Sequence, residues 1–402
     1  MNILFILNSF FPSIGGVEKV IENYCRQLLE IGANKISIIT FKRGQISELD
    51  LKKTKNLEIH HGIRIYRVKD NLFGLFMFIK MIKLYFKEKF DLIHTTDFWG
   101  IYSILFKLMF KVPIVHHIHG YQEICPNGLL LHGENCLHTS LRECQRRCDF
   151  RFHRYMIEKI IYKVLGRFSD IVLTVSDAVK QAYLEKHPQL KNRMFTLYNG
   201  VEINPIYENK RDNRFFLTDM INANDKILTF VGRLIPERNI YEIISNFPKI
   251  IDKDPNIKFI IVGSGPELKR LKKQVMDLQL EQHIKFTGLL IGRSLFEIYR
   301  NSDLLLMPII FPEPLSTVII ESMSQGCPVI TYNLGGMPEI IDDGKNGFLL
   351  EPYNWEGFLE IITGPFDKIS RNKIIEKIKK KFNIEKQARK LLAIYKIVLN
   401  RY

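Results

Sequence analysis

Residues 303–332 read DLLLMPIIFPEPLSTVIIESMSQGCPVITY, and this stretch contains the repeating unit of the fold. Two short apolar runs, LLLM and VITY, flank a segment in which Ser316 or Thr317 can cap a helix. The pattern predicts a helix over about Val318–Gln325, which Gly326 ends. A strand, a helix and a second strand in this order are typical of a parallel α/β sheet.

The same alternation of apolar runs and helical patterns continues on both sides of this stretch. The other runs that predict strands are NILFIL, KISIIT, DLIHTT, VPIVHHI and DIVLTV, then KILTFVG, IKFIIVG, IKFTG and GFLLEP. The two series meet near NGVEINP, residues 199–205, where glycine and proline interrupt the chain. Because 402 residues exceed what one hydrophobic core usually serves, we predict two parallel-sheet domains.

The chain is basic, with a net charge of +15 and a pI near 9.4. This charge favours an anionic partner, such as nucleic acid, anionic lipid headgroups or a phosphorylated small molecule. No nucleic-acid-binding module is visible and the basic residues alternate with core positions, so we expect no nucleic acid partner. No apolar run reaches the roughly 18 residues of a membrane span, which predicts a cytoplasmic protein.

In open parallel sheets, ligands bind where strands end and loops lead into helices. Gly15 and Gly16 occupy such a loop in NSFFPSIGGVEKV, residues 8–20. Their missing side chains let backbone N–H groups approach an anion, although a tight turn explains the pair equally well. The three-glycine dinucleotide fingerprint with its ribose-binding acid is absent, which argues against a dehydrogenase.

A second strand end carries positive charge. In FVGRLIPERN, residues 230–239, Gly232 ends the strand, and Arg233 and Arg238 follow around a turn. A guanidinium group binds phosphate oxygens through a planar fork at any working pH, so this pair suits a diphosphate without a metal ion. A solvated basic turn is the alternative interpretation.

Two carboxylates belong to the helix of the opening stretch. Glu313 precedes the helix, and Glu321 lies within it. Because an ionised carboxylate accepts hydrogen bonds and donates none, this pair suits the hydroxyl groups of a sugar and a ribose. Acidic residues at a helix start also favour the helix dipole, which is the structural alternative.

These motifs resemble, in their order along the chain, the family 4 retaining glycosyltransferases, glycosyl transferases group 1, of the GT-B fold. The spacing of Glu313 and Glu321, followed by SMSQGCPVI and GGMPEII, resembles the donor-binding motif of that family. GGVEKV resembles its acceptor-side glycine loop, IHG its active-site histidine segment, VSDAV and NGV its interdomain elements, and VGRLIPERN its phosphate-binding turn. The similarity extends across nearly the whole chain.

The resemblance implies two Rossmann-like domains that face each other across a cleft. Residues 1–200 would form the acceptor-side domain, with a cysteine-rich insertion at 121–150. Residues 201–383 would bind the nucleotide-sugar donor. The basic, amphipathic terminal helix, residues 384–402, would return to complete the first domain.

The resemblance also implies a reaction, in which a sugar leaves a nucleoside diphosphate with retention at the anomeric carbon and without a catalytic metal. The implied donor site consists of Gly15, Gly16, Gly232, Arg233 and Arg238 at the diphosphate, Glu321 at the ribose, and Glu313, His119 and the N–H groups of Leu315, Ser316 and Thr317 at the sugar. UDP- and GDP-sugars are the expected donors. The expected acceptor is a glycan or a polyprenyl- or other lipid-linked molecule in cell-surface polysaccharide or glycoconjugate biosynthesis.

Other interpretations of these motifs stay open. The chain could be a non-catalytic sugar-nucleotide-binding subunit or another GT-B enzyme such as a nucleotide-sugar epimerase. A metal-dependent transferase would use an Asp-x-Asp motif, and DKD at 252–254 has that spelling, although it lies in a polar turn where solvated acids are common. The family's usual Phe-Gly pair after the first glutamate is replaced by Leu315 and Ser316, so the resemblance does not identify the sugar.

Four cysteines cluster just after the histidine segment: Cys125, Cys136, Cys144 and Cys148. Because the cytoplasm disfavours disulfides, a structural zinc site is one interpretation, with His132 and His138 as substitute ligands. Free thiols and redox or disulfide chemistry are the alternatives. No cofactor is expected for catalysis itself.

Residues 72–90, LFGLFMFIKMIKLYFKEKF, combine a broad apolar face with four lysines. Such a helix can lie on an anionic membrane surface, which would suit a lipid-linked acceptor and a peripheral location on the inner face of the cell membrane. A helix packed on the core of the first domain, with a solvated basic edge, is the alternative.

Overall fold

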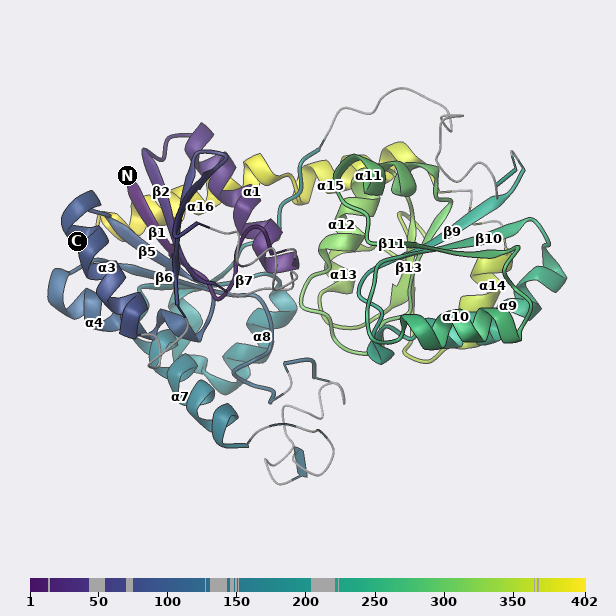
Figure 1. The fold of residues 1–402 in the computed structure, drawn as a ribbon, viewed down its shortest axis with the longest axis horizontal. Coiled ribbons are helices and arrows are strands. Elements are labelled where there is room, and N and C mark those ends of the chain that lie inside the picture. Colours follow the sequence, from purple (N-terminus) through teal and green to yellow (C-terminus); the bar gives the residue numbers. More distant parts are fainter. Residues whose placement is uncertain are drawn as a thin grey trace. The chain divides into compact units, whose positions relative to one another are not determined.

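The chain forms two compact α/β units in this computed structural model (Figure 1). The structure describes residues 1–13, 15–42, 55–69, 75–126, 128–130, 143–144, 148, 150, 152–203, 221–222, 224–364, 366 and 369–402. Unit 1 comprises Met1–Glu202 and Asn383–Tyr402, and unit 2 comprises Ile203–Phe382. Each unit is described by itself below.

Unit 1 is built on an eight-stranded sheet with the order β3-β4-β2-β1-β5-β6-β7-β8. Its strands are β1 Asn2–Ile6, β2 Lys35–Phe41, β3 Leu57–His60, β4 Ile63–Val68, β5 Leu92–Thr95, β6 Ile114–Ile118, β7 Ile171–Thr174 and β8 Met194–Thr196. All neighbours pair in parallel except β3 and β4, which form an antiparallel hairpin. The parallel sheet predicted for the first half of the chain is therefore confirmed.

Helices cover both faces of this sheet, so its central strands are buried along almost their whole length, whereas the edge strand β3 is partly exposed. The helices are α1 Gly16–Glu30, α3 Leu75–Glu88, α4 Ile101–Phe110, α7 Phe152–Phe168, α8 Asp177–Lys186 and α16 Ile384–Leu399, with short 3₁₀ turns η2 Phe98–Gly100 and η3 Pro188–Arg193. β1 shows how the layers arise. Ile3 and Phe5 pack toward α1 and α16, whereas Leu4 and Ile6 pack toward α3 and α4.

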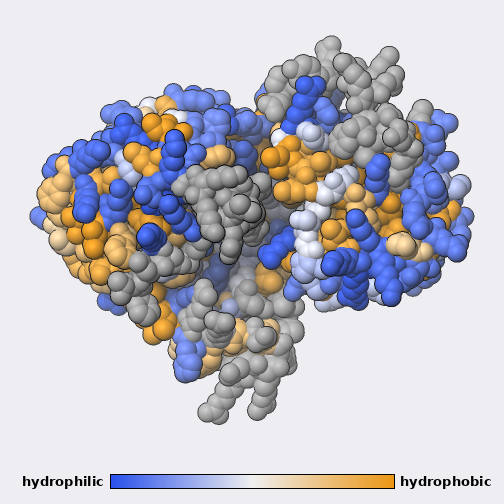
Figure 2. Space-filling view, viewed as in Figure 1, coloured by the Kyte–Doolittle hydropathy of each residue, from blue (hydrophilic) through white to orange (hydrophobic). Residues whose placement is uncertain are grey.

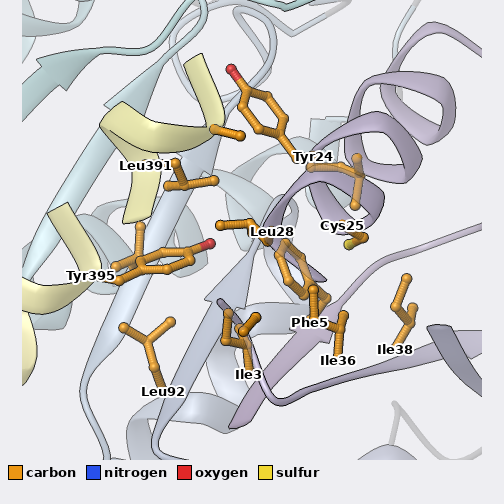
Figure 3. Close-up of a cluster of buried hydrophobic side chains, with 14 of the residues drawn as sticks. Ile3, Phe5, Tyr24, Cys25, Leu28, Ile36, Ile38, Leu92, Leu391 and Tyr395 are labelled. Atoms are coloured by element: carbon orange, nitrogen blue, oxygen red, sulfur yellow. The ribbon is translucent and has the colours of Figure 1, made fainter. Parts of the chain in front are cut away.

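The final helix, α16, supplies part of the core of unit 1. Leu391 and Tyr395 are fully buried and lie with Tyr24 and Leu28 of α1 above the strands (Figure 3). The Tyr395 hydroxyl lies 2.7 Å from Nδ1 of the buried His94 on β5.

Where the chain returns from unit 2 to unit 1, it lies against the segment that leaves unit 1. Val201 and Asn383 form a parallel bridge, and Ile384 N donates to Val201 O at 3.0 Å. The Asn383 side chain caps α16 by accepting from Lys386 N at 3.0 Å. A Cβ atom on Gly200 would lie 2.7 Å from the Ile384 Cα atom, so only glycine permits this approach.

Unit 2 is built on a six-stranded sheet, wholly parallel, with the order β11-β10-β9-β12-β13-β14. Its strands are β9 Lys226–Val231, β10 Ile257–Val262, β11 Ile284–Gly288, β12 Leu304–Met307, β13 Val329–Tyr332 and β14 Phe348–Leu350. Its helices are α9 Ile240–Lys253, α10 Leu268–Asp277, α11 Gly292–Asn301, α12 Thr317–Ser324, α13 Met337–Ile340, α14 Trp355–Thr363 and α15 Arg371–Lys381, and the 3₁₀ turn η4 spans Pro236–Arg238. This sheet confirms the second predicted parallel sheet.

One local feature agrees with the sequence pattern. The helix expected over about Val318–Gln325 is α12, Thr317–Ser324, one residue earlier, and Gly326 follows it with φ +80°. No helix in the described part of the chain has the length and apolar character needed to span a bilayer.

Candidate functional site

The residues proposed to hold the donor diphosphate lie at the end of β9, in the middle of the sheet of unit 2. Gly232 follows the strand with φ +156°, a conformation that side chains rarely adopt. The turn η4 and Asn239, which has φ +57°, then lead into α9. Arg233 is exposed, and among the described residues it has no ion-pair partner.

The loop after the neighbouring strand β10 packs directly on this turn. Leu234 N donates to Ser264 O at 2.9 Å, and Glu267 N donates to Leu234 O at 3.1 Å. A Cβ atom on Gly263 would lie 1.9 Å from Gly232 O, and one on Gly265 would lie 2.3 Å from Leu234 O. Glycine is therefore required for the two strand-end loops to meet backbone to backbone.

The loop that carries Glu313 is fixed from two sides. Ser316, 1% exposed, caps α12 by accepting from Ile319 N at 3.5 Å. Gly336 N donates to Glu313 O at 2.9 Å. Cβ atoms on Gly335 and Gly336 would lie 2.4 Å from Glu313 O and 2.2 Å from Pro314 O, respectively.

Arg238 and Glu313 form a two-pronged ion pair between these loops. Arg238 Nη1 donates to Glu313 Oε2 at 2.9 Å, and Nη2 donates to Oε1 at 3.2 Å. The two side chains are 18% and 16% exposed. Phe311 lies beneath the guanidinium, with 5.4 Å between Cζ and the ring centroid. The buried Arg238 Nε has no hydrogen-bond partner among the described residues.

The structure thus brings together Arg238 and Glu313, which the sequence assigned to different parts of the donor. Leu315 is 5% exposed, whereas Thr317 is half-buried at the first position of α12. Glu321 lies further along the same helix, half-buried and near the Tyr299 hydroxyl. Burial raises the pKa of Tyr299, and the negative charge of Glu321 raises it further.

Sequence reasoning noted Gly263 and Gly265 only as a glycine turn before a helix, and it did not single out Gly335, Gly336 or the aromatic ring of Phe311 under Arg238. The spelling GSG at 263–265 and GG at 335–336 was the available signal, since glycine pairs after strands mark close backbone approaches. The sequence does not show which backbone atom each glycine meets.

In the first unit, Gly15 and Gly16 begin α1 after β1. Gly15 has extended backbone angles and precedes the first helical residue without a side-chain cap. The Glu18 carboxylate folds back over it, since a Cβ atom on Gly15 would lie 2.3 Å from Glu18 Oε2. The Ser9 hydroxyl donates to the same carboxylate. The exposed N–H groups of this helix start therefore have an acid close by.

His119 directly follows β6 and is the one of three neighbouring histidines that reaches the surface. His116 and His117 are 1% and 0% exposed within the strand, whereas His119 is half-buried. The rings of His117 and His119 lie 4.1 Å apart. Burial, with a smaller contribution from His116, lowers the pKa of His119 to about 3. The imidazole is therefore neutral at ordinary pH, with Nε2 unpartnered among the described residues.

The cysteine cluster lies partly outside the described residues, since Cys136, His132 and His138 belong to the undescribed ranges. Cys125 is 3% exposed and Cys144 is 8% exposed, and both lie near the Tyr155 side chain. Cys148 N donates to Cys144 O at 2.8 Å. The zinc site stays a prediction.

Among the described residues, the one group of three side chains with metal-ligand spacing is Glu22, His60 and His61, whose ligand atoms lie within 4.8 Å of one another. Lys19 Nζ lies 3.3 Å from Glu22 Oε2, and His60 Nε2 lies 3.0 Å from Glu22 Oε1. The carboxylate is therefore already paired with the Lys19 ammonium group. In the DKD motif, Asp254 forms an ion pair with Lys226 at 2.7 Å.

Two family models match complementary parts of the chain. The model described as "Glycosyltransferase Family 4" matches residues 14–204, and the model described as "Glycosyl transferases group 1" matches residues 215–381. Together they cover both units. Arg233, Arg238, Glu313 and Glu321 lie within the second match, and Gly15, Gly16 and His119 lie within the first.

Individual proteins resemble the chain at low identity. Spore coat protein SA of Bacillus subtilis is 27% identical over 241 residues, which are 56% of this chain and 64% of that protein. The alpha-monoglucosyldiacylglycerol synthase of Streptococcus pneumoniae is 22% identical over 87% of this chain and 75% of its own. The crystal structure of Anabaena Alr3699/HepE in complex with UDP superposes with a TM-score of 0.75 at 20% identity, over 98% of this chain and 100% of that chain. The same protein was also crystallised with UDP-glucose.

Proposed function

Because the chain belongs to the family 4, group 1 glycosyltransferases and has the GT-B fold, we propose that it is a retaining enzyme that transfers a hexose from a nucleoside diphosphate. The observation that carries this proposal is the ion pair between Arg238 and Glu313. It joins the turn after β9, which is proposed to bind phosphate, to the carboxylate that precedes α12. One unit thereby supplies groups for both halves of a sugar nucleotide.

The donor diphosphate is assigned to Arg233 and Arg238, at the turn that begins with Gly232. Arg233 is exposed and unpaired among the described residues, so its fork is available to phosphate oxygens. Arg238 uses two N–H groups on Glu313 and retains the unpartnered Nε. The UDP and UDP-glucose complexes of HepE favour a UDP-sugar, with a GDP-sugar as the second candidate.

The transferred sugar is assigned to Glu313 and to the start of α12. The Arg238 guanidinium holds the Glu313 carboxylate in place, and the remaining lone pairs of the carboxylate can accept hydrogen bonds from sugar hydroxyls. The N–H groups of Leu315, Ser316 and Thr317 add donors beside it. Glu321, further along α12, is assigned to the ribose.

Unit 1 contributes Gly15 and Gly16 to the diphosphate and His119 to the sugar in this proposal. A neutral imidazole suits a sugar hydroxyl, because it both donates and accepts a hydrogen bond. The low pKa of His119, about 3, keeps it neutral.

Catalysis would depend mainly on stabilising the departing diphosphate. Its growing negative charge meets guanidinium groups already in place, and such preorganised charge is usually the largest single contribution to the rate. The proposed chemistry therefore needs no divalent ion, and a front-face attack would let the departing phosphate help to deprotonate the acceptor.

The proposed acceptor is a glycan or lipid-linked molecule of the cell surface, used at the inner face of the cell membrane. The Streptococcus pneumoniae relative is named for the synthesis of monoglucosyldiacylglycerol. This name supports lipids as one class of acceptor for this chain. The proposal keeps the cytoplasmic location that was expected from the sequence.

The proposal is tested by measuring binding and turnover separately. Thermal shifts against UDP-, GDP-, ADP- and dTDP-sugars identify the donor, because a ligand of the folded state raises the melting temperature. Slow hydrolysis of that donor, with release of the sugar in the same anomeric form, is the expected activity. If the donor binds but is never hydrolysed or transferred, the chain is a binding subunit instead.

A further inference from the structure

Three helices on one side of unit 1 expose large apolar side chains to solvent. On α3, α4 and α7, six such side chains are half exposed or more: Phe86 65%, Leu105 50%, Leu108 68%, Met109 59%, Ile157 59% and Ile160 58%. We call these six residues the apolar patch. Figure 2 shows hydrophobic residues gathered on the left side of the molecule, where Figure 1 labels α3 and α4. Exposed patches of this kind mark interaction sites.

Helix α3 has two apolar faces, and only one of them is needed for folding. Met77, Met81 and Leu84 are buried in the core beneath it. Ile79 and Phe86, on the opposite side of the helix, point outward and are 38% and 65% exposed. An amphipathic helix of a soluble protein normally carries polar residues on its outward side. The apolar residues on the outward side of α3 therefore indicate contact with something other than water.

Contacts between the helices make the patch continuous. Phe86 and Phe110 rings lie 5.9 Å apart, which joins α3 to α4. Ile104 of α4 and Leu165 of α7 share a buried cluster, which joins α4 to α7. The exposed residues therefore lie on a surface formed by neighbouring helices.

The charges around the patch are almost all positive. Lys83 and Lys87 on α3 and Lys163 and Arg167 on α7 are exposed. The one acid of α3, Glu88, faces inward, where it accepts from Ser37 and Tyr66. Helix α4 carries no acid, and α7 carries only the half-buried Glu158.

We propose that this surface docks unit 1 on an anionic lipid bilayer, with the apolar patch in the acyl and headgroup boundary and the lysines at the phosphates. Apolar side chains on helices that lie flat, bordered by lysine and arginine, are the features of interfacial membrane binding. A second copy of this chain fits less well, because a twofold contact would place the lysines of both copies against one another. The inference stands independently of the donor, since the docking surface contains none of the donor-site residues.

Flotation with lipid vesicles tests the apolar contribution. The intact chain is mixed with vesicles of phosphatidylcholine, with or without phosphatidylglycerol, and is expected to float only with the anionic vesicles. Leu108→Glu and Phe86→Glu should each weaken binding by about tenfold or more, since each replaces an exposed apolar side chain that would enter the bilayer with a charge. Met276→Glu on α10 is the matched control, because Met276 is 64% exposed but lies in unit 2.

Charge reversal tests the electrostatic contribution. Lys83→Glu or Lys87→Glu should weaken binding to anionic vesicles by about fivefold or more, since each basic residue near such a surface contributes about that factor. Lys269→Glu on α10, also exposed, should leave binding unchanged. Melting temperatures confirm that all variants fold.

Two results would overturn the proposal. One is equal flotation of Leu108→Glu and the unchanged chain. The other is a dimer in sedimentation that Leu108→Glu dissociates, without flotation of either form, which would assign the patch to a second copy. Donor binding by thermal shift, measured on the same variants, should stay unchanged, so a failure here is distinct from a failure of the proposed transferase.

Discussion

Arg238 donates two hydrogen bonds to Glu313 across the gap between the β9 turn and the loop before α12, at 2.9 and 3.2 Å. Both side chains are mostly buried, so each would be a costly isolated charge without the other. In the proposed donor site, a sugar nucleotide would therefore meet this ion pair as one unit rather than as two independent groups. The predictions for the two ends of the site therefore differ.

Glu313→Gln should lower turnover by about a hundredfold, comparable to the loss of one preorganised polar group in an active site. The substitution keeps the shape of the side chain but removes the charge that holds Arg238. Initial rates with the identified donor measure the effect, and the melting temperature shows that the fold survives. Glu281→Gln, at an exposed position of the same unit, should match the unchanged enzyme. Unchanged turnover of the Glu313→Gln enzyme would contradict the assignment of Glu313 to the donor site.

Arg233→Ala should weaken the affinity for the free nucleoside diphosphate by about tenfold or more, the usual effect of losing a charged hydrogen bond. Because Arg233 is exposed and unpaired among the described residues, folding should be unaffected. Arg238→Ala should weaken this affinity and should also lower the melting temperature, because it leaves the mostly buried Glu313 carboxylate without its ion-pair partner. Calorimetric titration with UDP and GDP compares the two variants. Unchanged affinity in Arg233→Ala would contradict the diphosphate assignment.

Acid should destabilise unit 1 through its buried histidines. Burial lowers the pKa of His116 to about 4, whereas an unfolded histidine titrates near about 6.5. Between these values the unfolded state binds more protons, so the stability is fully present above about pH 6.5 and is lost as the pH falls toward 4. The loss from His116 alone is roughly 3 kcal/mol.

The buried His94 and His117 have pKa values lowered in the same direction by burial and should add to this loss. Urea unfolding at several pH values measures it. His116→Gln should flatten the pH dependence between 4 and 6.5, whereas His153→Gln, at an exposed position of α7, should not. Identical slopes for the two variants would argue against this origin of the acid sensitivity.

Gly336→Ala should disturb the loop that carries Glu313. The added methyl group would lie 2.2 Å from Pro314 O, and such overpacking costs about 1–3 kcal/mol. Because the neighbour is backbone, the loop itself must move, and turnover should fall together with stability. Gly166→Ala in α7 is the control, since its nearest neighbour would lie 3.6 Å away, and it should raise stability by about 0.5–1 kcal/mol.

Metal chelation and metal analysis test two separate points: whether turnover needs a metal ion, and whether the cysteines bind structural zinc. EDTA should leave turnover unchanged, because the proposed chemistry relies on guanidinium groups. Metal analysis of the purified protein should show about one zinc ion per chain if the cysteines form a tetrahedral site. Cys144→Ser should then remove that zinc while donor binding is retained. A protein without zinc would leave the thiol interpretations.

Local patterns were enough to predict the α/β fold and the helix of the opening stretch. Ser316 and Gly326 act on residues next to them, so the start and end of α12 can be predicted from the sequence to within one residue. The contact of Arg238 with Glu313 joins residues 75 positions apart and depends on β9 lying beside β12, which no local pattern states. The same holds for Gly336 and its contact with the Glu313 carbonyl. Contacts between residues far apart in the sequence depend on the strand order, which the sequence pattern does not give. Caps and turns depend on neighbouring residues, which it does give.

The place of α16 determines when unit 1 can be completed during synthesis. Tyr395 and Leu391 fill its core, yet the ribosome makes them only after all of unit 2. Until then, α16 does not cover Tyr24 and Leu28, and the nascent first unit exposes a hydrophobic surface to solvent. Folding of the two units is therefore linked through translation order, and a chain that stops early would be a natural target for chaperones and proteases.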